Sequence, residues 1–355
     1  MGTIFSILFA ILIFSFLIFI HEFGHFITAK LSGVQVNEFS MFMGPAIWKK
    51  QIGETLYSIR CIPIGGYCAM EGEDADTDNP RSFQKAAWWK RLIILLAGAF
   101  MNFVAGVVIL AIILGPVPAV NVLEVQSFEE WSTLDDHGLQ VGDRIVELDG
   151  EKMLLYSDFS IVLALNPGEI HDVVVERSGQ KVYLENLKME LHPVTLEDGT
   201  ETERYGVTFG YEELDLSGRV RNVIYTAVDW VRQVGWSLRM LLTGQAGLKD
   251  MSGPVGIVGT MTDVASSSET ALDALRSLLF FGAYIAVNLA VMNLLPIPAL
   301  DGGRVVALLL TTFIQAITRK EIDPKYEGYI HGAGMLLLLL LMAIILFKDV
   351  IFLFQ

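Results

Sequence analysis

The chain has 355 residues, of which 53% are hydrophobic and 18% charged, and its mean hydropathy is +0.50. This composition excludes an ordinary soluble enzyme of this length and predicts an integral membrane protein. The sequence has no basic stripe, so we do not expect nucleic acid as a partner. Residues 119–275 carry 27 acidic and 11 basic side chains, against 13 and 14 in the rest of the chain. We therefore expect one acidic, water-exposed domain inserted into a nearly neutral membrane scaffold.

Four uncharged apolar runs approach the ~20 residues that a helix needs to cross the hydrocarbon. They are Ile4 to Ile20, Leu92 to Val117, Ser277 to Leu295 and Ile330 to Phe347. The first run has neither a positive n-region nor a small-residue cleavage site, so we expect it to stay in the protein rather than to be removed as a signal peptide. A shorter run, Val305 to Ile317, is interpreted as a half-buried or interfacial helix.

The charges of the loops predict the orientation. Lysine and arginine crowd the loops between the first and second spans and between the third and fourth: Lys30, Lys49, Lys50, Arg60, Arg81, Lys85, Lys90 and Arg91 in one, Arg304, Arg319, Lys320 and Lys325 in the other. Such loops remain in the cytoplasm. The N-terminus, the acidic domain and the C-terminus are then expected on the outer side.

The first span runs directly into the motif His21-Glu22-Phe23-Gly24-His25. Two histidines four residues apart share one helix face, so both can bind one zinc ion, with Glu22 beside a water molecule as general base. In a soluble protein this motif would suggest a metalloprotease. Here the site lies at or below a membrane surface, where ionisable groups are costly and indicate function. We expect the helix to continue to Leu31 and to end at Ser32-Gly33.

The next segment, Val34 to Met70, is expected to be rich in β-strand, with Pro63-Ile64-Gly65-Gly66-Tyr67 as a turn. Two interpretations stay open. The segment can be a hairpin that packs on the membrane. Alternatively, because a peptide bond inside a helix is shielded, an exposed strand edge beside the zinc can hold an unwound substrate by strand addition. Cys61 and Cys68 are interpreted as free thiols, and Glu71 to Pro80 as a solvated acidic loop.

In the second span, Gly98 and Asn102 form a polar notch on one helix face. Small residues allow helices to approach closely, and a buried asparagine can donate a hydrogen bond across the contact. We interpret the notch mainly as a packing feature.

The outward domain is expected from about Val120. The stretch Gly138 to Gly150 reads as a turn, a short strand and a hairpin, and strands are predicted at Asp172 to Arg177 and Lys181 to Leu184. Its Gly-Asp-x-Ile-x-x-x-x-Gly pattern resembles that of a PDZ domain, a module that binds extended peptide ends by strand addition. A generic β domain is the alternative. Three histidines without metal-ligand spacing are assigned to the surface: His137, His171 and His192.

Val220 to Leu242 is an amphipathic pattern too polar to span a membrane. The helix can pack against the outward domain or lie on the outer membrane surface. Met251 to Ile257 is expected to be a loop that enters the next membrane segment.

A catalytic zinc site needs a third protein ligand and one open position. Glu54 lies in a strand-like stretch and Glu71 in a charged loop, so neither fits a helical ligand pattern. The end of the third span offers Asp301, after two prolines that break the helix and before two glycines that allow close approach. Broken backbone at membrane depth is tolerated where protein surrounds it or where it lines a cavity. Asp301 is therefore the favoured third ligand.

These motifs together resemble the site-2 protease family of intramembrane zinc metalloproteases, specifically its PDZ-containing bacterial, RseP-like type, which cleaves anti-sigma factors. The resemblance covers essentially the whole chain. It rests on H-E-x-x-H after the first span and N-x-x-P-x-P-x-x-D-G after the third. Further matching segments are Pro63 to Tyr67, Ala97-Gly98 with Asn102-Phe103, and Ser252 to Ile257.

The resemblance implies one zinc ion bound by His21, His25 and Asp301, with Glu22 as base. It also implies that a membrane-associated β-loop containing Gly65, Gly66 and Tyr67 receives the substrate, and that Asn293 and Asn288 help to position it. Two features depart from the family pattern. Ala99 stands where proline is usual, and a single PDZ-like module is present where some relatives have two.

The predicted fold is a polytopic α-helical membrane protein with four spans, a membrane-associated β-hairpin region and one inserted extracytoplasmic PDZ-like domain. Its expected parts are residues 1–118, the first part of the membrane core, 119–215, the PDZ-like domain, 216–275, the amphipathic helix and connector, and 276–355, the second part of the core.

The predicted function is zinc-dependent cleavage of single-span membrane proteins, such as anti-sigma factors, in the bacterial cytoplasmic membrane, after an upstream site-1 type protease has removed their external part. We expect the active site to face the cytoplasm. An inactive PDZ scaffold and a metal transporter are the alternatives; a transporter would normally place polar residues along a path at the midplane.

Overall fold

The computed structural model describes residues 3–73, 77–166, 168–195, 199–247, 250–319 and 325–352. Within these ranges the chain forms two compact units, residues 1–110 with 241–355, and residues 111–240. Residues 74–76 of the expected acidic loop and the expected cytoplasmic Lys320 lie outside the described residues.

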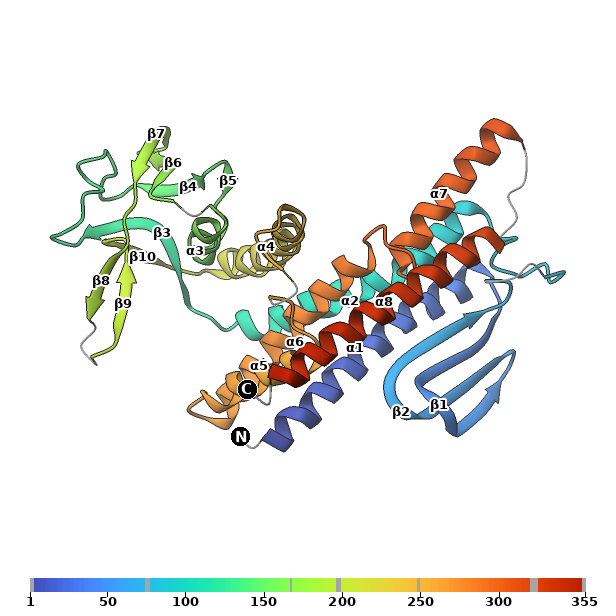
Figure 1. Cartoon of the computed structure of the whole chain (residues 1–355). Coiled ribbons are helices and arrows are strands. Elements are labelled where there is room, and N and C mark those ends of the chain that lie inside the picture. The colour runs from blue at the N-terminus through green and yellow to red at the C-terminus, as the bar shows by residue number, and fades with distance from the viewer. Residues whose placement is uncertain are drawn as a thin grey trace. The chain divides into compact units, whose positions relative to one another are not determined.

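The first unit contains helices long and apolar enough to cross a membrane: α1 (Thr3–Ser32), α6 (Ala271–Asn293), α8 (Lys325–Phe352) and most of α2 (Trp88–Leu114). Figure 1 shows these helices side by side as a bundle. Each of the four predicted spans thus falls on a helix of membrane length. The first helix ends at Ser32, and Gly33 follows with φ +83°, a left-handed conformation that glycine adopts without steric cost.

Two shorter helices complete the bundle, and one of them corrects the sequence interpretation. The stretch Met251 to Ile257 is not entirely a loop, because α5 (Pro254–Ser266) begins inside it with Gly253 as N-cap. Met261 and Ala265 of α5 are buried with residues of α1 and α6. The other short helix, α7 (Asp301–Thr318), covers the expected interfacial run.

The predicted β region is one strongly bent hairpin, β1 (Val36–Ile52) with β2 (Thr55–Met70). Because β2 folds back along β1, Ser40 lies opposite both Ser58 and Tyr67. Phe39 packs against Phe26 of α1, with ring centroids 4.9 Å apart, so one face of the hairpin covers this helix. The segment Pro63 to Tyr67 was expected to be a turn, but it belongs to β2, where Gly65 bends the strand at φ +77°.

The second unit contains a main β-sheet, a separate pair of strands, and helices. Its main sheet has the order β10-β3-β4-β6-β7, with β5 paired to β4. The strands are β3 (Ala119–Phe128), β4 (Arg144–Leu148), β5 (Glu151–Lys152), β6 (Ile170–Arg177), β7 (Gln180–Lys188) and β10 (Val207–Glu213); β8 (His192–Thr195) and β9 (Glu201–Arg204) form a separate pair. Helix α3 (Tyr156–Leu165) packs on the core. The strands predicted in this region are therefore present.

His171 was assigned to the surface, and this interpretation is wrong. Its side chain is 2% exposed, and its Nδ1 lies 2.7 Å from Asp149 Oδ2. Its Nε2 lies 3.1 Å from the carbonyl oxygen of Gly168. Both ring nitrogens are thus paired inside the domain, which is how a buried histidine avoids an unsatisfied polar atom.

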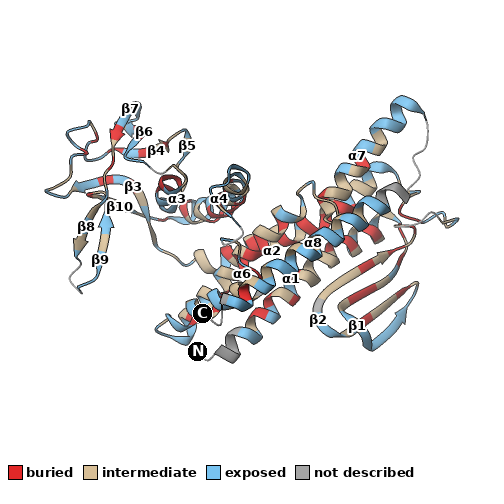
Figure 2. Ribbon diagram, viewed as in Figure 1, coloured by how far each residue is buried: buried red, intermediate tan, exposed pale blue. Residues whose placement is uncertain are grey.

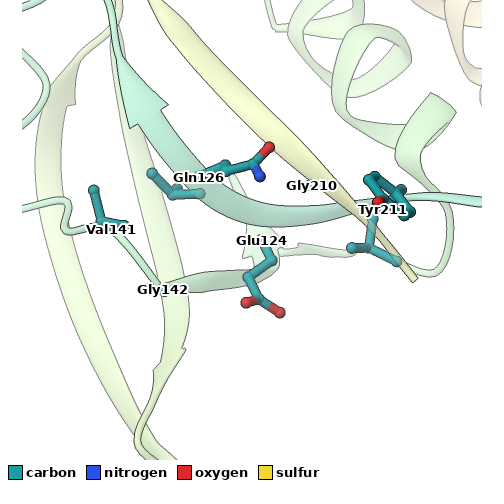
Figure 3. Close-up of a pocket in the computed structure, with 8 residues that line it drawn as sticks. Glu124, Gln126, Val141, Gly142, Gly210 and Tyr211 are labelled. Carbon is teal, nitrogen blue, oxygen red and sulfur yellow. The ribbon is translucent and has the colours of Figure 1, made fainter. Parts of the chain in front are cut away.

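A groove of about 410 Å³ lies on the sheet of this unit (Figure 3). It runs over Gly210 of β10, where no side chain fills the space, and is bordered by Glu124, Gln126, Val141 and Tyr211. Val141 and Tyr211 are exposed large apolar side chains, so the groove combines apolar walls with two polar groups.

The amphipathic helix α4 (Leu216–Thr243) packs against the second unit through one face. Trp236 joins the core of this unit, and Arg232 Nη1 lies 3.1 Å from the buried Asp158 of α3. The opposite face exposes Val220, Ile224 and Val228. Packing on the domain is therefore confirmed, and an apolar face remains available for the membrane surface.

The contact between α3 and α4 predicts a dependence of stability on pH. Burial and the neighbouring Asp158 carboxylate raise the pKa of Asp229 to about 7. A carboxyl whose pKa is higher in the folded than in the unfolded state destabilises the fold as it ionises. Relative to a variant with a neutral side chain at position 229, the melting temperature of the full-length protein should therefore fall as pH rises from about 4 to about 7. Asp229→Asn, which stays neutral, should flatten this slope. An equally steep slope in Asp229→Asn would contradict the assignment.

Candidate metal centre

Three side chains from two helices converge at one point of the first unit. His21 and His25 come from α1, and Asp301 is the first residue of α7. The two histidine Nε2 atoms lie 3.3 Å apart, and Asp301 Oδ2 lies 3.2 Å from His21 Nε2 and 3.3 Å from His25 Nε2. The buried Oδ2 of Asp301 has no hydrogen-bond partner. The three atoms form a nearly equilateral triangle, and the Asp301 oxygen without a partner is one of its corners.

This triangle has the size that a tetrahedral metal ion requires. Bonds of about 2.0–2.1 Å to nitrogen and oxygen place neighbouring tetrahedral ligands about 3.3–3.4 Å apart. One carboxylate and two imidazoles are also an ordinary donor set for a catalytic zinc ion, and three protein ligands leave a fourth position open. The residues present therefore fit such an ion.

The remaining ring nitrogens of the histidines are oriented by α2 and α6. His25 Nδ1 lies 2.8 Å from the carbonyl oxygen of Ile94, which can only accept, so Nδ1 carries the proton and Nε2 is free to bind a metal. His21 Nδ1 lies 3.5 Å from the side-chain amides of both Asn102 and Asn293. Both contacting atoms are amide nitrogens, which donate. In the tautomer that binds a metal through Nε2, His21 Nδ1 carries the proton, and rotation of the Asn102 amide would turn its buried, unpartnered oxygen toward that proton.

Glycines allow α1 and α2 to approach closely enough for these contacts. A Cβ atom on Gly98 would lie 2.4 Å from His25 Nε2, and one on Gly24 would lie 2.4 Å from the Ala97 carbonyl oxygen. The notch of Gly98 and Asn102, interpreted from sequence mainly as packing, therefore borders the metal site directly. The sequence signal was a small residue four positions before an asparagine on an apolar helix, a pattern that packing alone also produces.

The turn between α6 and α7 places Asp301. Helix α6 ends at Asn293, and Ala299 adopts φ +79°, which is rare for a residue with a Cβ. A Cβ atom on Gly302 would lie 2.3 Å from the carbonyl oxygens of Leu294 and Leu295, and one on Gly303 2.3 Å from that of Ile297. The two glycines let α7 start directly against the broken end of α6.

Glu22 lies between this centre and the hairpin. The Cys68 backbone forms a hydrogen bond with the Glu22 carboxylate, and a Cβ atom on Gly66 would lie 3.5 Å from Glu22 Cγ. Tyr67 lies beside Arg60, whose guanidinium is 5.4 Å from the ring centroid. Gly65 to Met70 form the end of β2, so the structure brings an edge of the hairpin to the glutamate of the motif.

The other candidates occupy different places. The Asn288 amide donates to the Tyr284 carbonyl oxygen one turn earlier on α6, 2.8 Å away, so it serves its own helix. Glu54, rejected as a ligand from its sequence context, bridges Lys30 and Arg81, at 2.6 and 2.5 Å. An ion pair also joins Arg304 of α7 to Glu73, which follows β2. Asp301 is thus the carboxylate that meets the two histidines among the described residues.

An H-E-x-x-H helix with a carboxylate ligand, at one end of a bundle of membrane-length helices, is the arrangement of a membrane-embedded metallopeptidase. The sequence profile of peptidase family M50 matches residues 9–341. The chain therefore belongs to this family, the family of the site-2 proteases.

Individual relatives agree with this assignment. A Clostridium perfringens protein named "Putative zinc metalloprotease" is 36% identical over 349 residues, which cover 98% of each chain. The "Zinc metalloprotease RasP" of Geobacillus kaustophilus is 27% identical, with 98% of each chain covered. The "Regulator of sigma-W protease RasP" of Bacillus subtilis is 28% identical, with 96% of this chain and 97% of the relative covered.

The approach of α2 to the histidines predicts the effect of one methyl group. Gly98→Ala should weaken metal binding by at least about tenfold, because its Cβ would collide with both imidazoles, while alanine itself favours the helix. Gly259→Ala in α5 is the matched control, since its Cβ would meet no atom within 4 Å. Bound metal per chain, measured by atomic spectroscopy after dialysis against a chelator, checks this. Equal metal retention in both variants would refute the expected clash.

Proposed function

We propose that the chain is a zinc-dependent intramembrane endopeptidase that cleaves single-span membrane proteins, anti-sigma factors or similar regulators among them. The observation that carries the proposal is the triangle of His21 Nε2, His25 Nε2 and Asp301 Oδ2, with sides of 3.2–3.3 Å, at the end of a membrane-length helix. The names of relatives support both the metal and the reaction, since several are named zinc metalloproteases.

In this proposal His21, His25 and Asp301 hold one zinc ion. When bound, zinc acts as a Lewis acid on the scissile carbonyl and makes water a nucleophile at neutral pH. Glu22 takes the proton from the attacking water and passes it to the leaving amine. Its position one residue after His21 places the carboxylate on the same turn as the ligands.

The hairpin edge supplies the substrate site. Gly65, Gly66 and Tyr67 belong to the end of β2 that runs beside Glu22, and a strand added there would present its peptide bonds to the base. A substrate helix must unwind to reach this state, and pairing with the edge replaces the hydrogen bonds it loses. We assign Asn293, whose amide lies near His21, to holding the substrate or His21 in place. Asn288, whose amide donates within α6, would position the substrate only indirectly.

The protein is proposed to lie in the bacterial cytoplasmic membrane with the metal centre toward the cytoplasm and residues 119–215 outside. The basic loops support this orientation. The outer, PDZ-like domain would control access, so that substrates enter after an upstream protease has shortened them. If this domain also binds a peptide end, we expect the peptide to bind in the groove over Gly210, because the walls of this groove are apolar.

Replacing the base separates chemistry from metal binding. Glu22→Gln keeps the shape of the side chain but cannot accept a proton, so cleavage of a co-reconstituted single-span substrate should fall by at least about 10²-fold. Zinc content should stay near that of the wild type. Asp301→Ala is the comparison, since it should lose both zinc and cleavage.

The outcomes distinguish the alternatives. A wild-type rate in Glu22→Gln would refute the mechanism. Zinc binding without cleavage in the wild type would favour the scaffold, and zinc uptake into sealed vesicles would favour the transporter.

A further inference from the structure

Helix α8 carries a histidine within its membrane-length stretch, Gly328 to Ile351. His331 is followed by a long run of leucines, several of them exposed on the surface of the bundle, including Leu336, Leu337 and Leu340. Figure 2 shows much of α8 as exposed or intermediate. An ionisable side chain in such a helix is costly and marks a functional contact. The proposed chemistry gives His331 no part.

His331 contacts the turn that carries Asp301. The backbone N–H of Ala299 donates to His331 Nδ1 over 3.0 Å. Ala299 lies two residues before Asp301 and has the rare φ of +79°. A nitrogen that accepts this bond carries no proton, so the neutral imidazole holds its proton on Nε2. The His331 side chain thus accepts the hydrogen bond of a backbone N–H in a turn, where a regular helix would have supplied a carbonyl oxygen.

Gly334 touches the same turn from the same face of α8, three residues further along the helix. A Cβ atom there would lie 2.3 Å from Pro298 Cβ and 2.8 Å from the Pro298 carbonyl carbon and oxygen. Gly332, between the two, faces open space, with no atom within 4 Å of an added Cβ. Contact with the turn therefore depends on an acceptor at 331 and on the missing side chain at 334.

We propose that His331 and Gly334 are positioning residues that hold the turn Pro296 to Leu300, and through it the carboxylate of Asp301, in the geometry of a metal ligand. Asp301 is the ligand in need of such support. The two histidines share one continuous helix, whereas Asp301 follows a broken segment with a strained residue. Both residues contact the turn, and they would act on Asp301 through it. The inference rests on the proposed role of Asp301 as a zinc ligand.

The first test removes and then restores the acceptor in the full-length protein. His331→Phe keeps an aromatic ring without an acceptor, whereas His331→Asn places an amide oxygen near the position of Nδ1. We expect His331→Phe to weaken zinc affinity by about tenfold, as loss of an outer-shell contact does. The kcat for a reconstituted single-span substrate should fall, with KM changed by less than about twofold, because substrate contacts are untouched. His331→Asn should restore both zinc affinity and kcat.

The second test uses the matched pair of glycines. Gly334→Ala should displace the turn and weaken zinc affinity, whereas Gly332→Ala should behave as the wild type. Zinc affinity is measured by competition with a chromophoric chelator, so this result does not depend on any cleavage assay. The glycine pair also keeps the proposal testable if His331→Phe fails to fold.

The outcomes separate this inference from the proposed function. Wild-type zinc affinity in both His331→Phe and Gly334→Ala would overturn the inference and leave the protease assignment intact. Equal losses in His331→Phe and His331→Asn would also overturn it, because the acceptor would not be what matters. If both variants weaken zinc affinity and the wild type cleaves no substrate, the positioning role stands and the proposed function fails.

Discussion

The close approach of α1 and α2 is the constraint on which the metal centre depends. Gly24 and Gly98 sit where the two helices touch, and a methyl group on either would meet another atom at 2.4 Å. Because the helices come this close, the Ile94 carbonyl can orient His25 and the Asn102 amide can reach His21. A larger separation would leave the ring nitrogens without partners in a setting where unpaired polar groups are expensive. The glycines therefore fix the histidine geometry as firmly as the histidines' own spacing does.

The centre also shows how a polar site can exist at the end of apolar helices. Each helix satisfies its own backbone, and the irregular segment that carries the third ligand is the turn after Asn293. Within that turn the Ala299 N–H is bound by His331, and the carboxylate of Asp301 lies at the start of α7, where the helix dipole favours negative charge. The break in the helix thus creates the position of the third ligand without leaving its backbone donor unpaired.

Sequence patterns predicted the parts of this site that depend on local geometry. His21 and His25 share a face because a helix has 3.6 residues per turn, and Asp301 stood out because prolines and glycines break an apolar run. The four membrane-length helices followed from length and hydropathy alone. Asn288 was chosen only from the family pattern. Its amide nitrogen donates to the Tyr284 carbonyl oxygen of its own helix, and its part in positioning a substrate stays a prediction.

The features that sequence reasoning missed depend on contacts between distant segments. The sequence pattern of Gly98 and Asn102 is the same whether α2 packs against an ordinary helix or against a helix that carries metal ligands. Gly65 and Gly66 suggested a turn, but pairing with β1 made them part of a strand. His171 was taken for a surface residue because nothing local foretold Asp149 as its partner. His331 carried no motif, and only its contact with Ala299 reveals it.

The three ligand positions therefore differ in how they are held. One helix sets the spacing of His21 and His25, so movement of other elements changes it little. Asp301 follows a turn that α8 contacts through His331, and its helix is tied by Arg304 to Glu73, just beyond the strand that borders Glu22. The segment that would receive substrate and the helix that carries Asp301 are thus joined by an ion pair. The hairpin also packs directly on α1 through Phe39 and Phe26, so the proposed substrate edge is connected both to the helix of the two histidines and to the helix of the third ligand.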